Sequence, residues 1–331
     1  MRKYIDPVYL AVSEEAWRSR IYSEIFDSLT TILERIEDVE KSTDTLYKLV
    51  KFKASEGLFS KIYSNNPFNN NPEVQDFYIK LFKDRIIPEL YRRFEWCPSF
   101  CIPSNQSSQI DQNIQSCNFS NTLVPEDVLL EWNHLVEQCL YCNNSNELLC
   151  LISPFSNQTK LENENSFLAE KLRVTFDVDE LFDVSDFLDE SILSKSNLRE
   201  NCLKKAIEIY YNQCVMRGEW TSNLQPQDHA FDDFFWKSIE QAKLVDESHD
   251  YKERFVSSMA QVVYDLDIDI RKHKYKSDKI LVARKKYAKY SADVFKMGQG
   301  TIDSRCSRIF YCKVSQQLYF YEFEPDRHKG E

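Results

Sequence analysis

Residues Ser307 to Glu324 read SRIFYCKVSQQLYFYEFE, and this stretch decides the local fold at the end of the chain. Residues 307–314 and 318–323 are rich in isoleucine, valine, phenylalanine and tyrosine, the residue types enriched in β-strands. Ser315-Gln316-Gln317 separates them, a connection short enough for a hairpin, although it lacks the Asn-Gly pair typical of tight turns. The sequence therefore predicts a β-hairpin here.

Upstream of the hairpin lies a basic segment, residues 271–290, which contains a single acid, Asp278, and three interleaved tyrosines. Cations that neutralise phosphates release counterions, and aromatic rings stack on unpaired bases, so this mixture suits single-stranded nucleic acid. The alternative is a solvated lysine-rich face that balances an acidic body. The predicted nucleic-acid-binding residues are Arg271, Lys272, Lys274, Lys276, Lys279, Arg284, Lys285, Lys286, Tyr287 and Lys289.

The charge of the chain is unevenly spread. The 331 residues carry a net charge of -11, yet residues 271–331 hold fifteen Lys and Arg against seven Asp and Glu. The rest of the chain therefore carries -19. An acidic body with a basic end is expected when one part binds a polyanion such as RNA or DNA.

The order of elements toward the end of the chain adds a resemblance to a known family. Helices are followed by a lysine-bearing strand, then by a strand with the pattern Arg308-Ile309-x-Tyr311, and then by an apolar strand that ends in basic residues. Over residues 231–329 this pattern resembles toxins of the RelE/ParE superfamily. Members of that superfamily usually stand alone, so the preceding 230 residues depart from it.

The resemblance implies candidate catalytic residues. Arg308 would hold the scissile phosphate, and Arg327 or His328 would be the terminal catalytic or charge-stabilising group, with Lys279 or Lys286 as an upstream cation. Imidazole and guanidinium groups suit metal-independent RNA cleavage, which needs a base near the 2′-hydroxyl and cations on the phosphorane. Some members of the superfamily inhibit gyrase instead, and some homologues only bind. The structural alternative is a hairpin in which Arg308 forms an ion pair.

The overall fold class that the sequence predicts is mainly α, with a smaller C-terminal α+β module built on an antiparallel sheet or hairpin. Apolar residues at helical spacing predict helices over 14–37, 43–63, 77–90, 125–140, 197–216, 231–244 and 251–266. Short strands are expected over residues 148–153, 172–176 and 279–282. The predicted domains are residues 1–97 (helical), 98–123 (polar linker or long loop), 124–226 (helical with short strands) and 227–331 (basic α+β module).

Cofactor chemistry finds little support in the sequence, and no cofactor is predicted. The chain has only five glycines and neither a GxGxxG nor a GxxxxGK[ST] motif, which argues against classical nucleotide folds. The acidic residues of 177–190 suit either Mg²⁺ binding or a solvated face, and the second is favoured. Four cysteines are weak zinc candidates, with ordinary reduced thiols the favoured interpretation: Cys97, Cys101, Cys139 and Cys142.

The start of the chain lacks the apolar region of a secretion signal, and no run of eighteen apolar residues follows. Together with ten cysteines, this predicts a reducing cytoplasmic location and no membrane partner. The leading functional hypothesis is an RNA-cleaving, toxin-like or host-defence effector that acts through its C-terminal module. The alternative is a non-enzymatic helical adaptor in a larger complex, which binds protein partners and holds RNA or DNA with its basic end.

Overall fold

The structure is a computed structural model that divides the chain into two units. Unit 1 comprises Met1–Glu40 and Thr45–Leu181, and unit 2 comprises Lys41–Asp44 and Phe182–Glu331. Each unit is described by itself. The described residues are 2–6, 9, 21–43, 50–54, 80–96, 149–152, 172–175, 177–194, 198–266, 272–274, 292–297 and 307–325.

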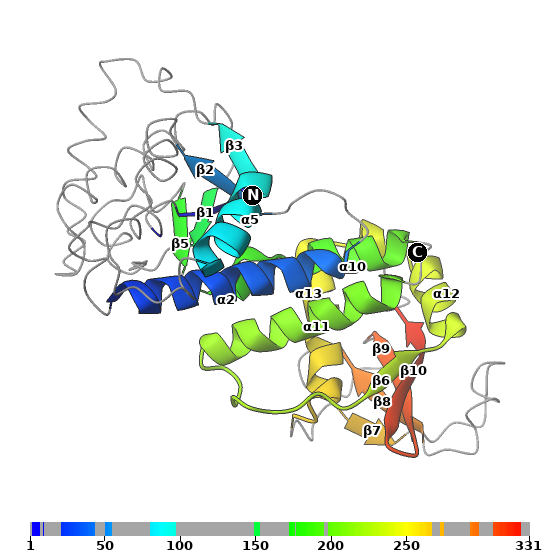
Figure 1. Cartoon of the computed structure of the whole chain (residues 1–331). Helices are drawn as coiled ribbons and strands as arrows, with labels where there is room; N and C mark the ends of the chain where they lie inside the picture. The colour runs from blue at the N-terminus through cyan, green and yellow to red at the C-terminus, as the bar shows by residue number, and fades with distance from the viewer. Residues whose placement is uncertain are drawn as a thin grey trace, which may run out of the picture. The chain divides into compact units, whose positions relative to one another are not determined.

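Unit 1 is built on a five-stranded sheet in the order β3-β2-β1-β4-β5 (Figure 1). Every neighbouring pair in it is parallel. This is the order of doubly wound α/β sheets, in which the direction of strand addition reverses between the first and fourth strands. The strands are β1 (Arg2–Ile5), β2 (Val50–Ala54), β3 (Phe94–Trp96), β4 (Leu149–Ile152) and β5 (Leu172–Thr175).

The parallel sheet corrects the predicted fold class, because the described part of the chain is mixed α/β. A helical domain was predicted over residues 1–97, but β1, β2 and β3 lie in that range. Residues 43–63 were predicted to be helical, whereas Val50–Ala54 is a strand in which Val50 and Phe52 are fully buried. The strands pair with partners some fifty to one hundred residues away, and such long-range pairing leaves no local periodicity.

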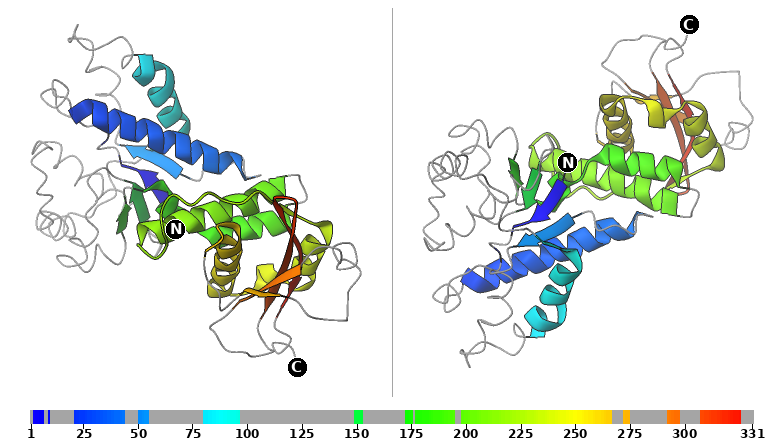
Figure 2. Two further views of the ribbon diagram at one scale, coloured as in Figure 1. Left: turned by 90° about the horizontal axis from the view of Figure 1, so that it is seen from below. Right: turned by 90° about the horizontal axis from the view of Figure 1, so that it is seen from above.

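The helices of unit 1 begin with α2 (Ile21–Lys41), where the prediction of an amphipathic helix is confirmed. Its inward face carries buried apolar side chains three and four residues apart, at Leu29, Ile32, Leu33 and Ile36. A π-helix, η2 (Phe82–Ile86), leads into α5 (Ile87–Arg93), whose first turn holds Pro88, a position that needs no backbone N–H. Both views of Figure 2 show α2 and α5 on the same side of β2. A 3-10 helix, η3 (Val178–Leu181), follows β5.

Unit 2 contains four α-helices among its described residues. Asp183 caps the first of them by accepting a hydrogen bond from the backbone N–H of Ser185, and Asp232 caps the third in the same way through Phe234 N–H. The helices are α10 (Val184–Leu193), α11 (Leu198–Met216), α12 (Asp233–Gln241) and α13 (His249–Val263), with a 3-10 helix η4 (Leu244–Asp246) before the last. The predictions of helices near 197–216, 231–244 and 251–266 are confirmed.

The second sheet has the order β6-β10-β9-β8-β7. Strand β6 runs parallel to β10, and the other neighbours are antiparallel. The predicted hairpin is confirmed as β9 and β10, joined at Ser315 and Gln316, with Ser315 at a φ of 59°. The strands are β6 (His229–Phe231), β7 (Lys272–Lys274), β8 (Ala292–Lys296), β9 (Arg308–Val314) and β10 (Gln317–Glu324).

Aromatic side chains form much of the core between this sheet and its helices. The ring of Phe320 on β10 stacks on Phe231 of β6 with centroids 5.5 Å apart. Phe323 meets Phe255 of α13 edge to face, and Phe235 of α12 packs against Phe231. Such rings bury large apolar areas and fix the positions of β6 and α12 against β10.

No helix within the described ranges is both long enough and apolar enough to cross a membrane.

Candidate functional site

The predicted nucleic-acid-binding segment starts on the edge of the second sheet. Lys272 and Lys274 are the first and last residues of β7, which is the terminal strand in the order β6-β10-β9-β8-β7. β7 pairs with β8 in antiparallel register, so residues 275–291 are the connection between the two outermost strands on this side. The other predicted residues of this set lie outside the described residues: Arg271, Lys276, Lys279, Arg284, Lys285, Lys286, Tyr287 and Lys289.

Arg308, the predicted phosphate-binding residue, is the first residue of β9. Its guanidinium forms an ion pair with the carboxylate of Glu324 on β10, with Nη1 and Oε2 3.2 Å apart. The side chains are 27% and 20% exposed, so solvent reaches both. Arg308 faces Lys296 of β8 in the strand register and Glu324 on its other side. Arg327 and His328, the other two predicted catalytic residues, lie outside the described residues.

Metal ligation has no support in the described part of the chain. No group of three or more His, Cys, Asp or Glu side chains there is arranged to hold a metal ion. The acidic residues of 177–190 form structural contacts instead: Asp183 caps α10, and Asp189 accepts a 2.6 Å hydrogen bond from Lys252 Nζ. The weak zinc candidates Cys97, Cys101, Cys139 and Cys142 lie outside the described residues.

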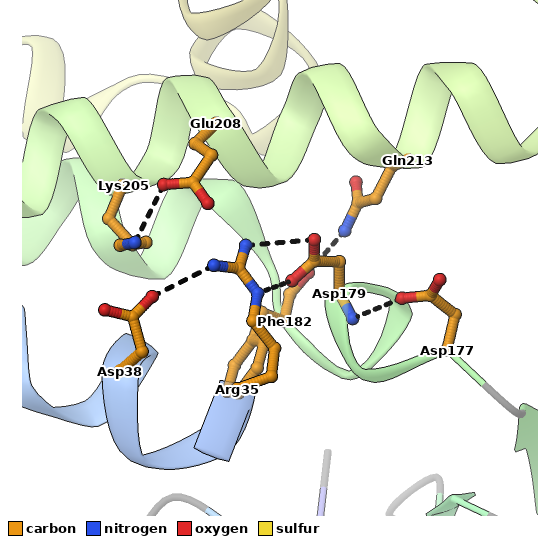
Figure 3. A network of polar contacts seen from close by, with 8 residues as sticks. All are labelled: Arg35, Asp38, Asp177, Asp179, Phe182, Lys205, Glu208 and Gln213. Carbon is orange, nitrogen blue, oxygen red and sulfur yellow. Dashed lines mark hydrogen bonds and ion pairs between the residues drawn. The ribbon is translucent and has the colours of Figure 1, made fainter. Parts of the chain in front are cut away.

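Within unit 1, Arg35 of α2 organises a polar network with residues that follow β5 (Figure 3). Its Nε and Nη2 donate to the two carboxylate oxygens of Asp179 at 2.8 and 3.0 Å, and Nη1 donates to Asp38. Asp177 in turn accepts the backbone N–H of Asp179 at 2.8 Å. A bidentate pair of this kind fixes the orientation of both partners, so it ties α2 to the segment that leaves the sheet after β5.

The carboxyl edge of the parallel sheet is a feature that the sequence reasoning missed. Asp6 directly follows β1, is fully buried, and donates its backbone N–H to the carbonyl of Ile152 on β4 at 2.9 Å. This places Asp6 beside the point where the strand order reverses, which is where open α/β sheets bind ligands. The signal in the sequence was a lone acid after a four-residue strand, Arg2–Ile5, that helical patterning hid.

Two groups beside this edge have perturbed acidities. Burial and the nearby charge of Asp6 raise the pKa of the Tyr9 phenol well above its ordinary value, so Tyr9 stays protonated and can only act as a neutral hydrogen-bonding group. Burial also raises the pKa of the Asp177 carboxyl, despite the hydrogen bond from the Asp179 backbone. Such shifts gather at functional sites but also accompany structural networks. Here the hydrogen bonds of Figure 3 account for the position of Asp177.

The fold therefore defines unit 1 as an open parallel α/β sheet without a glycine-rich phosphate loop, and unit 2 as an α+β module. Comparisons of the chain with protein-family models, with curated proteins and with solved structures found no match.

Proposed function

We propose that the protein engages nucleic acid, preferentially single-stranded RNA, through the β7–β8 edge of unit 2. The observation that carries the proposal is that the basic segment begins on β7, the terminal strand of the sheet, and is the connection from β7 to β8. Lysines on the border of a sheet remain available to a phosphate backbone, because an edge strand has a neighbour on one side only.

The chemistry of cleavage is proposed as the second part of this function. Arg308 stands at the end of β9 near Lys296 in the register, with partial exposure to solvent. A guanidinium at that position can stabilise a phosphorane after it exchanges Glu324 for the scissile phosphate. In this proposal Arg308 acts with Arg327 and His328, as the resemblance to the RelE/ParE toxins implies, and the reaction is metal-independent.

The experiment is binding and cleavage of a labelled single-stranded RNA across a salt titration. Wild-type protein is compared with a Lys272→Ala/Lys274→Ala variant, and the matched control is Lys237→Ala/Lys243→Ala, which removes the same charge from two exposed lysines of unit 2. We expect the test variant to weaken binding and to lower the slope of log affinity against log salt by roughly 2, about one for each lost phosphate contact. Equal effects of the two variants would refute the β7 assignment.

The cleavage step is tested separately with Arg308→Ala and His328→Ala in the presence of EDTA. Loss of cleavage in both variants, with RNA still bound, supports an endoribonuclease. Salt-sensitive binding by a wild-type protein that does not cleave RNA supports the adaptor instead, in which the basic segment only holds nucleic acid for a protein partner.

We also propose a reducing, cytoplasmic setting for this function. The support is the set of free, buried cysteines among the described residues, Cys150, Cys202, Cys214 and Cys312. Burial raises the pKa of the Cys150 and Cys214 thiols to about 11 each, so both stay as unreactive thiols at neutral pH.

A further inference from the structure

A cavity of about 400 Å³ lies within unit 2, far along the sheet order from β7. It is bordered by α11, by the segment that leads to β6 and by the end of α13. Its volume falls within the range of small-molecule sites, about 300–1,000 Å³. The lining residues that matter to the argument are Lys204, Glu208, Tyr211, Asn212, His229 and Tyr264.

His229 supplies the buried polar group of this cavity. Its side chain lies on β6, the residue is 8% exposed, and its Nδ1 is 2.9 Å from the backbone carbonyl oxygen of Gln227. Among the residues that the structure describes, no hydrogen-bonding group partners the other ring nitrogen, Nε2. A buried polar atom without a partner is uncommon in a folded protein, and it needs an explanation.

The protonation state of this ring follows from its contacts. A carbonyl oxygen only accepts hydrogen bonds, so Nδ1 of His229 carries the proton and donates it to Gln227. Burial lowers the pKa of the ring, which keeps it neutral at physiological pH. Nε2 is therefore an unprotonated acceptor, and the ligand that satisfies it must bring an N–H or O–H donor.

Two stacked tyrosines form a flat, rigid part of the wall. The rings of Tyr211 and Tyr264 lie 3.7 Å apart between centroids with planes only 5° from parallel. The hydroxyl of Tyr211 donates to the carbonyl of Thr221 at 2.8 Å and accepts the backbone N–H of Leu224 at 3.0 Å, which fixes the ring. An immobilised aromatic wall favours a planar ligand, because stacking on it costs little conformational entropy.

The charged residues of the lining balance one another. Lys204 and Glu208 lie one turn apart on α11, and each side chain is 37% exposed, in contrast to the buried His229. Each also has a partner of opposite sign: Lys204 Nζ is 2.9 Å from Glu200, and Lys205 Nζ is 2.7 Å from Glu208. A site with this balance offers donors and acceptors without a net field, and so favours a neutral ligand over a phosphate.

We propose that this cavity binds a neutral, planar nitrogen heterocycle of the class of nucleobases and nucleosides, with an N–H of the ligand donated to Nε2 of His229. Such rings display donors and acceptors along one edge, which suits His229 together with Glu208 and Asn212, and their faces suit the tyrosine wall. This inference rests on unit 2 alone and does not depend on the proposed function at the β7–β8 edge.

The test is a titration of the full chain with adenosine, guanosine, cytidine and uridine, with ribose as the non-planar comparison. Binding is followed by calorimetry and by the imidazole nitrogen resonances of His229 in ¹⁵N-labelled protein. We expect at least one nucleoside to bind and to shift Nε2, ribose to do neither, and nucleoside monophosphates to bind no more tightly than nucleosides. In His229→Phe, which keeps a ring beside Phe231 and Phe320 but removes the acceptor, affinity should fall about tenfold or more.

The matched control is His249→Gln, which alters a histidine whose side chain is 56% exposed and does not line the cavity, and it should leave affinity unchanged. The proposal is overturned if no nucleoside binds at millimolar concentration, if ribose binds as well as the nucleosides, or if His229→Phe binds like wild type. Should His229→Phe fail to fold, the Nε2 resonance of the wild-type protein decides: an unmoved resonance in the presence of a bound nucleoside overturns the assignment.

Discussion

The guanidinium of Arg93 on α5 contacts both carboxylate oxygens of Glu40 on α2, each at 2.8 Å, with the arginine side chain fully buried. Arg93 also donates to the carbonyl of Val50 on β2, and Glu40 accepts the Val50 backbone N–H. The pair therefore joins two helices to one strand of the parallel sheet, over a sequence separation of 53 residues.

Removal of Arg93 should destabilise unit 1 strongly. Arg93→Ala leaves the Glu40 carboxylate buried without its cation, and loss of one partner of a buried pair costs about 3–5 kcal/mol. The measurement is urea-induced unfolding followed by circular dichroism. Arg92→Ala serves as the control, because that neighbouring side chain is 59% exposed, and its effect should stay below about 1 kcal/mol. Similar midpoints for both variants would contradict the structural role of the pair.

The same region shows what the sequence could predict and why it failed elsewhere. The repeat of Leu29, Ile32 and Ile36 is a local pattern, and it placed α2 correctly. β2 is five residues long and β3 only three, so neither is long enough to display a period of its own. Their pairing depends on β1, which is distant in the chain, and only the folded structure brings these segments together.

The scarcity of glycine was also read too broadly. Five glycines do exclude a glycine-rich phosphate loop, because that loop needs close backbone approach to a ligand. They do not exclude the parallel 3-2-1-4-5 strand order, which depends on buried apolar strands. The candidate sites divide in the same way. Arg308 could be singled out from its strand pattern, whereas the unpartnered Nε2 of His229 depends on a three-residue strand that forms only beside β10.

The β9–β10 turn predicts a stabilising substitution. Ser315 has a φ of 59°, whereas Gln316 is not among the described residues with positive φ, an arrangement that favours glycine at the first turn position. Relief of left-handed strain exceeds the entropy that glycine gains in the unfolded chain, so Ser315→Gly should raise stability by about 0.5–1 kcal/mol. Thermal unfolding provides the measurement. Gln316→Gly is the control, and it should lower stability or leave it unchanged; an equal gain from both would show that turn strain is not the cause.

The contact between His249 and Asp183 predicts a dependence of stability on pH. Nε2 of His249 lies 2.9 Å from Asp183, and this hydrogen bond raises the pKa of the imidazole above its ordinary 6.5. Burial alone would raise the pKa of Asp183, but hydrogen bonds from Ser185 and His249 outweigh it and lower that pKa below 3.8. The histidine binds its proton more tightly when folded, so its contribution is complete below pH 6.5 and disappears as the pH rises through the folded pKa.

The corresponding measurement compares the melting temperatures of wild type and His249→Gln from pH 5 to pH 9. The wild type should be slightly more stable at the acidic end, and the difference should vanish at the alkaline end. High salt should reduce the difference at pH 5, because the pair is exposed and its charges are screened. A difference that is constant across the range would mean that the imidazole charge plays no part.

The last prediction separates a structural from a chemical role for Arg308. As a cross-strand pair, Arg308 and Glu324 contribute roughly 0.2–1 kcal/mol to stability. Arg308→Ala, Glu324→Gln and the double variant should therefore unfold within about 1 kcal/mol of wild type in urea. Their effects on RNA should diverge, because only the guanidinium can hold a phosphate, and Glu324→Gln releases it from its carboxylate.

We accordingly expect Arg308→Ala to lose most RNA cleavage, and Glu324→Gln to keep cleavage and bind RNA at least as tightly as wild type. The double variant should behave as Arg308→Ala does, since the carboxylate acts on RNA only through the arginine. If Arg308→Ala and Glu324→Gln change RNA affinity and cleavage to the same extent, the pair serves the hairpin and the catalytic assignment fails. The comparison is decisive because both variants break the same 3.2 Å contact, and they differ only in which charge remains.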